Sequence, residues 1–177
     1  MLEAVLFDWT NTLVEFTWDD DLLVAGHEAA LAALGREDGG FTDRYRPVVL
    51  ESLRARGLKT GIVANSWPEP GRLLRADLEA FGLSHLFDVC VFSTDIGFAK
   101  PAPEIFMRAL DQIGVDPLGA MYVGDSLAGD VQGAANLGMT TVQALWFRAD
   151  DTTRGIEPDF MAFTAMDVLN AVRRLAR

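Results

Sequence analysis

The stretch AVLFDWTNTL, residues 4 to 13, places a single carboxylate directly after a short apolar run. Four apolar residues in succession are typical of a strand that is covered on both faces of a parallel sheet. Asp8 follows this strand, and no second acid stands near it in the stretch. Because a buried carboxylate without a partner is costly, Asp8 indicates a partner such as a metal ion.

Similar apolar runs recur along the chain and alternate with segments of helical period. The expected strands are residues 4–8, 60–65, 87–93, 120–124 and 140–145, and the expected helices are residues 43–56, 70–81, 103–113, 129–137 and 164–175. This alternation predicts an α/β fold with a Rossmann-like, doubly wound parallel sheet. Ligands in such folds bind at the carboxyl ends of the strands, where Asp8, Asn65 and Asp125 fall.

Residues 14–43 depart from this alternation. They contain one amphipathic helix, residues 22–34, and a loop with the sequence GREDGG. We interpret them as a minimal helical, cap-like insertion into a core formed by residues 1–13 and 44–177. This insertion is far shorter than the ~50 residues of a small independent domain.

Composition and charge exclude several classes of function. The chain has 177 residues and a net charge of −11, which argues against nucleic-acid and anionic-membrane partners. No apolar run approaches the ~20 residues of a membrane span, and the N-terminus has no basic segment that would indicate a signal peptide. A single cysteine, Cys90, allows no internal disulfide. We therefore expect a cytoplasmic protein.

Four short sequence segments follow one another in a characteristic order. They are Asp8, the pair Asn65-Ser66, Lys100 within FAKPAPEIF, and YVGDSLAGD at residues 122–130. This set resembles the haloacid dehalogenase superfamily, a large group of mostly magnesium-dependent phosphatases. The resemblance covers nearly the whole chain apart from residues 14–43. Its most specific parts are the Lys-Pro-x-Pro motif and the Gly-Asp pair that is followed by Asp130.

The resemblance implies a role for each of these residues. Asp8 would be the nucleophile and would form an aspartyl-phosphate. Mg²⁺ would be held by Asp8, Asp125, the backbone carbonyl of Thr10 and, directly or through water, Asp130. Lys100 would offset the repulsion between the carboxylates and bind the phosphate of a small phosphorylated substrate.

Two positions depart from the pattern of the family. Family phosphatases carry a second aspartate two residues after the nucleophile, which acts as a general acid and base, and Thr10 stands at that position here. The second strand of the family ends in Ser or Thr followed by Asn, whereas this chain has Ala64-Asn65. Asn65 is therefore expected at the phosphate, and Ser66 is the alternative source of the missing hydroxyl.

These departures leave three readings of the function. The first is a Mg²⁺-dependent phosphatase that acts through Asp8, slowed by the loss of the second acid. The second is a non-catalytic binding or regulatory module, which Thr10 and Ala64 favour. The third is a 2-haloacid dehalogenase, which the retained metal position at Asp125 disfavours because that chemistry needs no metal. The short insertion implies either an open site or a site covered by a second subunit, which would make the protein a homodimer.

Overall fold

The computed structural model describes residues 1–13, 46–66, 71–147 and 153–175. The expected cap-like insertion at residues 14–43, including the helix at residues 22–34, lies outside the described residues. The beginning of the expected helix at residues 43–56 is also outside them, and the described part is α3 (Arg46–Arg54).

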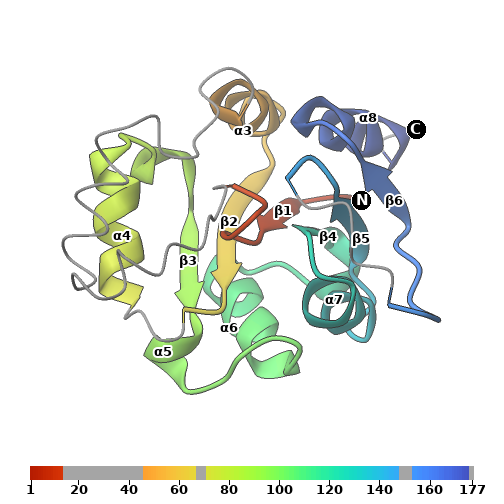
Figure 1. Ribbon diagram of the computed structural model, residues 1–177. Coiled ribbons are helices and arrows are strands. Elements are labelled where there is room, and N and C mark those ends of the chain that lie inside the picture. The colour runs from red at the N-terminus through yellow and green to blue at the C-terminus, as the bar shows by residue number, and fades with distance from the viewer. Residues whose placement is uncertain (14–45, 67–70, 148–152, 176–177) are drawn as a thin grey trace.

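The described residues form one six-stranded parallel sheet with the order β3-β2-β1-β4-β5-β6 (Figure 1). The strands are β1 (Ala4–Phe7), β2 (Lys59–Ala64), β3 (Val89–Phe92), β4 (Ala120–Gly124), β5 (Thr140–Ala144) and β6 (Phe160–Ala162). β1 pairs with both β2 and β4, so the strand that leads to Asp8 lies inside the sheet. The predicted Rossmann-like parallel α/β fold is confirmed.

Helices cover both faces of this sheet (Figure 1). One core contains apolar side chains of α3, α4 (Gly71–Ala80) and α8 (Ala165–Leu175). The opposite core contains those of α6 (Pro103–Ile113) and α7 (Gln132–Ala135). Covering on both faces explains why the strands are continuous apolar runs and why no residue of β1 or β4 is exposed.

The structure corrects the expected elements at several ends. Ser93 begins a short helix, α5 (Ser93–Ile96), where the third strand was expected to continue. The helix expected at residues 129–137 is a π-helix, Leu127–Val131, followed by the short α7. β6 was not expected at all, because three residues after a loop carry too little periodicity. The helix at residues 103–113 has the predicted bounds.

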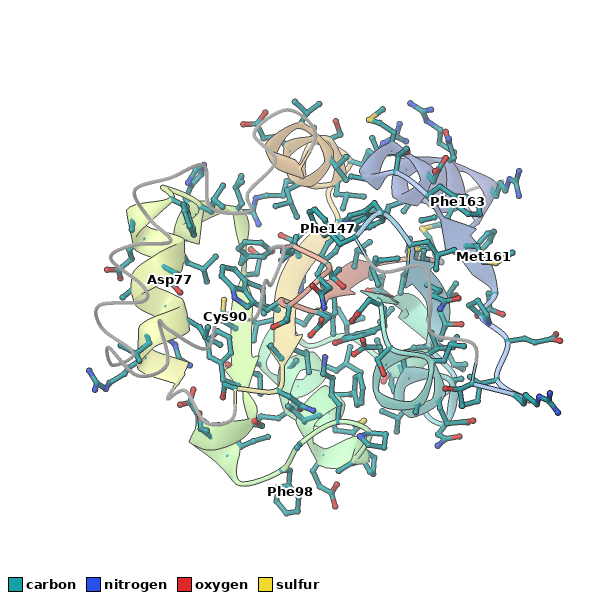
Figure 2. The ribbon with its side chains drawn as sticks, in the orientation of Figure 1. Asp77, Cys90, Phe98, Phe147, Met161 and Phe163 are labelled. Carbon is teal, nitrogen blue, oxygen red and sulfur yellow. The ribbon has the colours of Figure 1, made fainter. Side chains whose placement is uncertain are left out.

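β6 forms an edge of the sheet and carries exposed apolar side chains. Met161 and Phe163 are 61% and 65% exposed, and both lie at this outer edge (Figure 2). The predicted homodimer stays a prediction.

Figure 2 also shows Cys90 on β3, where it is half-buried, and burial raises the pKa of its thiol to about 11. Among the described residues, no helix has the length and apolar character needed to cross a membrane.

Gly124 allows the chain after β4 to turn back sharply. A Cβ at this position would lie 2.4 Å from the carboxyl carbon of Asp130, so the two backbone segments can approach this closely only where residue 124 has no side chain. The π-helix that follows brings Asp130 to this position, and π-turns of this kind occur frequently at functional sites.

We expect Gly124→Ala to destabilise the protein, because the new methyl group overlaps buried atoms of Asp130. The cost should be in the range of ~1–3 kcal/mol that is typical of overpacking. Urea unfolding followed by circular dichroism measures it. The matched control is Gly129→Ala, whose Cβ would approach only the Ser126 side chain, with the hydroxyl oxygen at 3.2 Å and the Cβ at 3.6 Å. An equal loss in both variants would contradict the steric explanation.

Candidate functional site

Asp8 lies at the carboxyl end of β1 and is almost completely buried. Its backbone N–H donates to the carbonyl of Val123 over 2.8 Å, which extends the β1–β4 pairing by one residue. The chain then turns, with Asn11 in the left-handed region at φ 56°. The N–H of Leu13 closes the turn by donating to the carbonyl of Trp9. This local structure points a strand-end carboxylate out of the sheet at the place where ligands bind in such folds.

Lys100 joins the buried acids at this end of the sheet. Its ammonium donates to Asp8 Oδ1 over 2.5 Å, to Asp130 Oδ1 over 2.6 Å and to the Tyr122 hydroxyl over 3.0 Å. The side chains of Lys100, Asp8 and Asp130 are all nearly inaccessible to solvent. The resemblance implied that Lys100 offsets the repulsion between the carboxylates, and the structure brings Lys100, Asp8 and Asp130 together.

Asp125 completes a cluster of three carboxylates. One ligand oxygen from each of Asp8, Asp125 and Asp130 lies within 4.8 Å of the other two, and all three residues are buried. Asp130 is oriented through both of its oxygens, because Oδ2 accepts from the backbone N–H of Ser126 over 3.0 Å while Oδ1 faces Lys100. The three acids come from two neighbouring strands and the π-helix, and the backbone fixes their positions.

The cluster is electrostatically unbalanced. Burial raises the pKa of Asp8 to about 7; the Lys100 ammonium opposes this rise, and the charges of Asp130 and Asp125 add to it. Burial alone would lower the pKa of Lys100, but the carboxylates of Asp130 and Asp8 outweigh it and raise that pKa to about 12. One permanent cation therefore faces three acids, and ionisation of Asp8 is the costly step.

A divalent metal fits this donor set. The ligand atoms are all carboxylate oxygens that lie within 4.8 Å of one another, and such oxygen ligands suit Mg²⁺. Asp8 and Asp125 could hold such an ion, with Asp130 near them. Thr10, whose backbone carbonyl is the fourth expected ligand, lies two residues beyond Asp8 and is half-buried.

Asn65 contacts the main chain of Lys100 with both ends of its amide. Asn65 Oδ1 accepts from the Lys100 backbone N–H over 2.8 Å, and Asn65 Nδ2 donates to the Lys100 carbonyl over 3.2 Å. The predicted contact of Asn65 with phosphate stays a prediction. What the structure adds is that Asn65 attaches the loop before α6 to the end of β2.

The Ser66 side chain takes part in a second network. Its hydroxyl lies 2.6 Å from the Thr94 hydroxyl and accepts from the Thr94 backbone N–H. The backbone N–H of Ser66 donates to the Ser93 hydroxyl over 2.9 Å. These bonds connect the end of β2 to α5. The alternative in which Ser66 supplies a phosphate-binding hydroxyl also stays a prediction.

Tyr122 is the site residue that reasoning from the sequence missed. It lies in the middle of β4, is 1% exposed, and donates its hydroxyl proton to the carbonyl of Val63 over 2.7 Å. A signal for it was present, because a tyrosine in a fully buried strand needs a partner for its hydroxyl. Burial raises the pKa of Tyr122 well above its usual value, so the hydroxyl keeps its proton.

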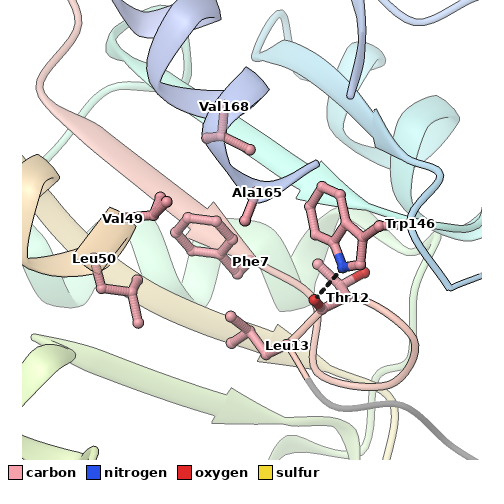
Figure 3. Close-up of a pocket in the computed structure, with 8 residues that line it drawn as sticks. All are labelled: Phe7, Thr12, Leu13, Val49, Leu50, Trp146, Ala165 and Val168. Carbon is pink, nitrogen blue, oxygen red and sulfur yellow. Dashed lines mark hydrogen bonds between the residues drawn. The ribbon is translucent and has the colours of Figure 1, made fainter. Parts of the chain in front are cut away.

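A small cavity is lined by residues that do not belong to this cluster (Figure 3). Its volume is about 10 Å³, enough for one water molecule at most. The side chains of Phe7, Val49 and Val168 line it, and Trp146 Nε1 donates to the Thr12 carbonyl at its rim over 3.0 Å. A cavity of this size is too small to hold a metabolite.

Phosphatases are among the known proteins that this chain is similar to. The chain is 36% identical over 163 residues to the glyceraldehyde 3-phosphate phosphatase of Methanopyrus kandleri, a match that covers 84% of this chain and 65% of the relative. It is 36% identical over 110 residues to the phosphoserine phosphatase of Thermus thermophilus, which covers 62% of this chain and 40% of the relative. The chain thus spans less than two thirds of the length of either relative.

Solved structures have the same fold. A HAD phosphatase from Thermococcus onnurineus has a TM-score of 0.75 and 25% identity, with 97% of this chain and 98% of that chain covered. A putative HAD-hydrolase from Bacillus subtilis, bound to magnesium, has a TM-score of 0.71 and 17% identity over 97% of this chain and 98% of that chain.

The family model for haloacid dehalogenase-like hydrolases matches residues 42–138, which is more than half of the chain. This segment contains Asn65, Lys100, Asp125 and Asp130, and the fold adds Asp8 from β1 to them. The chain therefore belongs to the haloacid dehalogenase-like hydrolases.

Proposed function

We propose that this protein is a Mg²⁺-dependent phosphatase that hydrolyses a small phosphorylated metabolite through an aspartyl-phosphate on Asp8. The observation that carries the proposal is the buried cluster in which Lys100 lies between Asp8 and Asp130, with Asp125 beside them. The two relatives named above are phosphatases of phosphorylated three-carbon compounds, which supports a substrate of this size.

In this proposal, an Asp8 oxygen attacks phosphorus as the ester bond to the leaving oxygen breaks. A water molecule then attacks the phosphoryl group, releases inorganic phosphate and regenerates the carboxylate. Lys100 stabilises the negative charge on the phosphoryl oxygens, together with Asn65 or Ser66 at the end of β2. A bound Mg²⁺, held by Asp8, Thr10, Asp125 and Asp130, would supply electrostatic stabilisation of the same charge and keep Asp8 ionised.

Thr10 sets the expected speed of this reaction. A threonine hydroxyl does not exchange protons usefully near neutral pH, so the leaving oxygen and the attacking water lack their usual acid and base. General acid–base catalysis contributes typically ~10²–10⁴-fold, so the reaction should be slow but measurable. The second step depends most on a base, and the aspartyl-phosphate should therefore accumulate.

A second candidate function is a binding or regulatory module that holds phosphate and metal without turnover. The observation that favours it is the pair of substitutions, Thr10 and Ala64, at positions where active phosphatases of the family carry reactive side chains. The complete set of Asp8, Lys100, Asp125 and Asp130 favours catalysis. A dehalogenase remains the weakest candidate, because Asp125 retains a position that serves a metal.

We expect wild-type protein to give a burst of p-nitrophenol from p-nitrophenyl phosphate, followed by slow turnover. Thr10→Asp should raise the steady-state rate, toward the ~10²-fold lower end of general acid–base contributions. Asp8→Asn should remove both phases. Stopped-flow absorbance and a steady-state assay of the three proteins measure these effects. If neither wild type nor Thr10→Asp releases p-nitrophenol, the result would favour the binding module. Fast wild-type turnover without a burst would refute our account of Thr10.

We also expect Mg²⁺ together with beryllium fluoride to raise the thermal unfolding temperature more than either does alone, because the anion completes the metal site. At one hundred times the dissociation constant, the gain would be about 2.7 kcal/mol. Asp125→Asn should abolish the effect. The matched control is Asp111→Asn, at an exposed position of α6. Absence of any shift in wild type would mean that the metal and phosphate pocket does not form.

A further inference from the structure

Lys100 is held at both ends of its side chain. At the root, Asn65 bonds to the backbone N–H and carbonyl of Lys100 in the same way that a neighbouring strand would. At the tip, the ammonium has three protons and three acceptors: Asp8, Asp130 and the Tyr122 hydroxyl. A lysine side chain has four flexible bonds, and fixing both ends removes most of its freedom.

We propose that Tyr122 is a positioning residue that fixes the direction of the Lys100 ammonium. Its hydroxyl donates to the Val63 carbonyl over 2.7 Å and accepts from Lys100 Nζ over 3.0 Å. Because the proton of the hydroxyl is used by Val63, an oxygen lone pair is left to face Lys100. The direction in which Tyr122 accepts is therefore determined by the backbone of β2.

The ring of Tyr122 cannot easily move away from this position. It packs edge-on against Phe106, with the ring centroids 5.0 Å apart and the planes at 76°. The residue is 1% exposed and is among the largest fully buried side chains of the described residues. The packed ring thus holds the hydroxyl in place, and the hydrogen bond to the Val63 carbonyl fixes its direction, as a positioning group requires.

A neutral acceptor suits this third position better than another carboxylate would. Asp8 and Asp130 already contact the ammonium and Asp125 lies near both of them, so a further acid would raise the cost of ionising Asp8. The hydroxyl holds one N–H of the ammonium without adding charge. As an incoming anion draws the other two N–H groups from the carboxylates, the contact with Tyr122 keeps the ammonium aimed at it.

The chain contains only two lysines, Lys59 and Lys100, which allows a direct test of this positioning. We expect NMR relaxation of ¹³Cε-labelled lysine to show Lys100 as rigid as the backbone, with an order parameter near ~0.85. Tyr122→Phe should lower that value while leaving the signal of Lys59, which donates to the Ile113 carbonyl, unchanged. A wild-type value below ~0.6, or no change in the variant, would overturn the proposal.

The catalytic consequence rests on the proposed function and has its own control. Tyr122→Phe should lower kcat/KM about tenfold, less than the ~10²–10³-fold loss in kcat typical of removing a stabilising donor outright. It should also weaken inhibition by orthovanadate by a similar factor. The control is Thr60→Val, which removes another fully buried hydroxyl that donates to a backbone carbonyl, that of Leu86, without touching Lys100.

These measurements separate a positioning role from a merely structural one. If Tyr122 only fills the core, Tyr122→Phe and Thr60→Val will lose stability to a similar extent, and neither will change kcat/KM or the affinity for orthovanadate. That outcome would overturn the catalytic part. If wild type shows no hydrolysis, the proposed function fails instead, and the rigidity of Lys100 still decides whether Tyr122 positions it.

Discussion

The buried ammonium of Lys100 links three parts of the chain that are distant in sequence. It contacts Asp8 after β1, Asp130 in the π-helix and Tyr122 within β4, and its own backbone is bound to Asn65 after β2. Such a buried network adds little net stability, because desolvation of the charges offsets their attraction. Removing one member is nevertheless costly, by ~3–5 kcal/mol, because it leaves a buried charge unpaired. The network therefore determines the positions of the site residues more than it stabilises the fold.

The backbone near β4 accepts unusual geometry to complete this network. Gly124 lies against the Asp130 carboxylate at a distance that no side chain would permit. The π-helix then widens the first turn after the strand, and Ser126 both caps it and orients Asp130. The surrounding core, which includes the fully buried Ala134 of α7, holds it in place.

Reasoning from sequence succeeded where a local pattern carries the information. The apolar runs predicted five of the six strands. The positions where these runs end predicted that Asp8 and Asp125 lie at the carboxyl ends of their strands. β6 was not predicted because a strand of three residues, of which one is exposed, is too short to show a periodic pattern. The hydrogen-bond partners of Asn65 and Tyr122 were not predicted for another reason. Hydrogen bonds between residues so far apart in sequence depend on the order and register of the strands, which only the folded chain shows. The same holds for the bond between Ser66 and Thr94.

The inner place of β1 in the sheet has a consequence for how the protein forms. Val5 pairs with Thr60 on one side and with Met121 on the other, so the two neighbours of β1 come from parts of the chain that are far from it and from each other in sequence. Closing so long a loop slows folding, and an apolar strand that is still unpaired during folding is prone to aggregation. Lys100, Asp125 and Asp130 also lie far from Asp8 in sequence. The surroundings of Asp8 are therefore complete only when contacts between residues distant in sequence have formed.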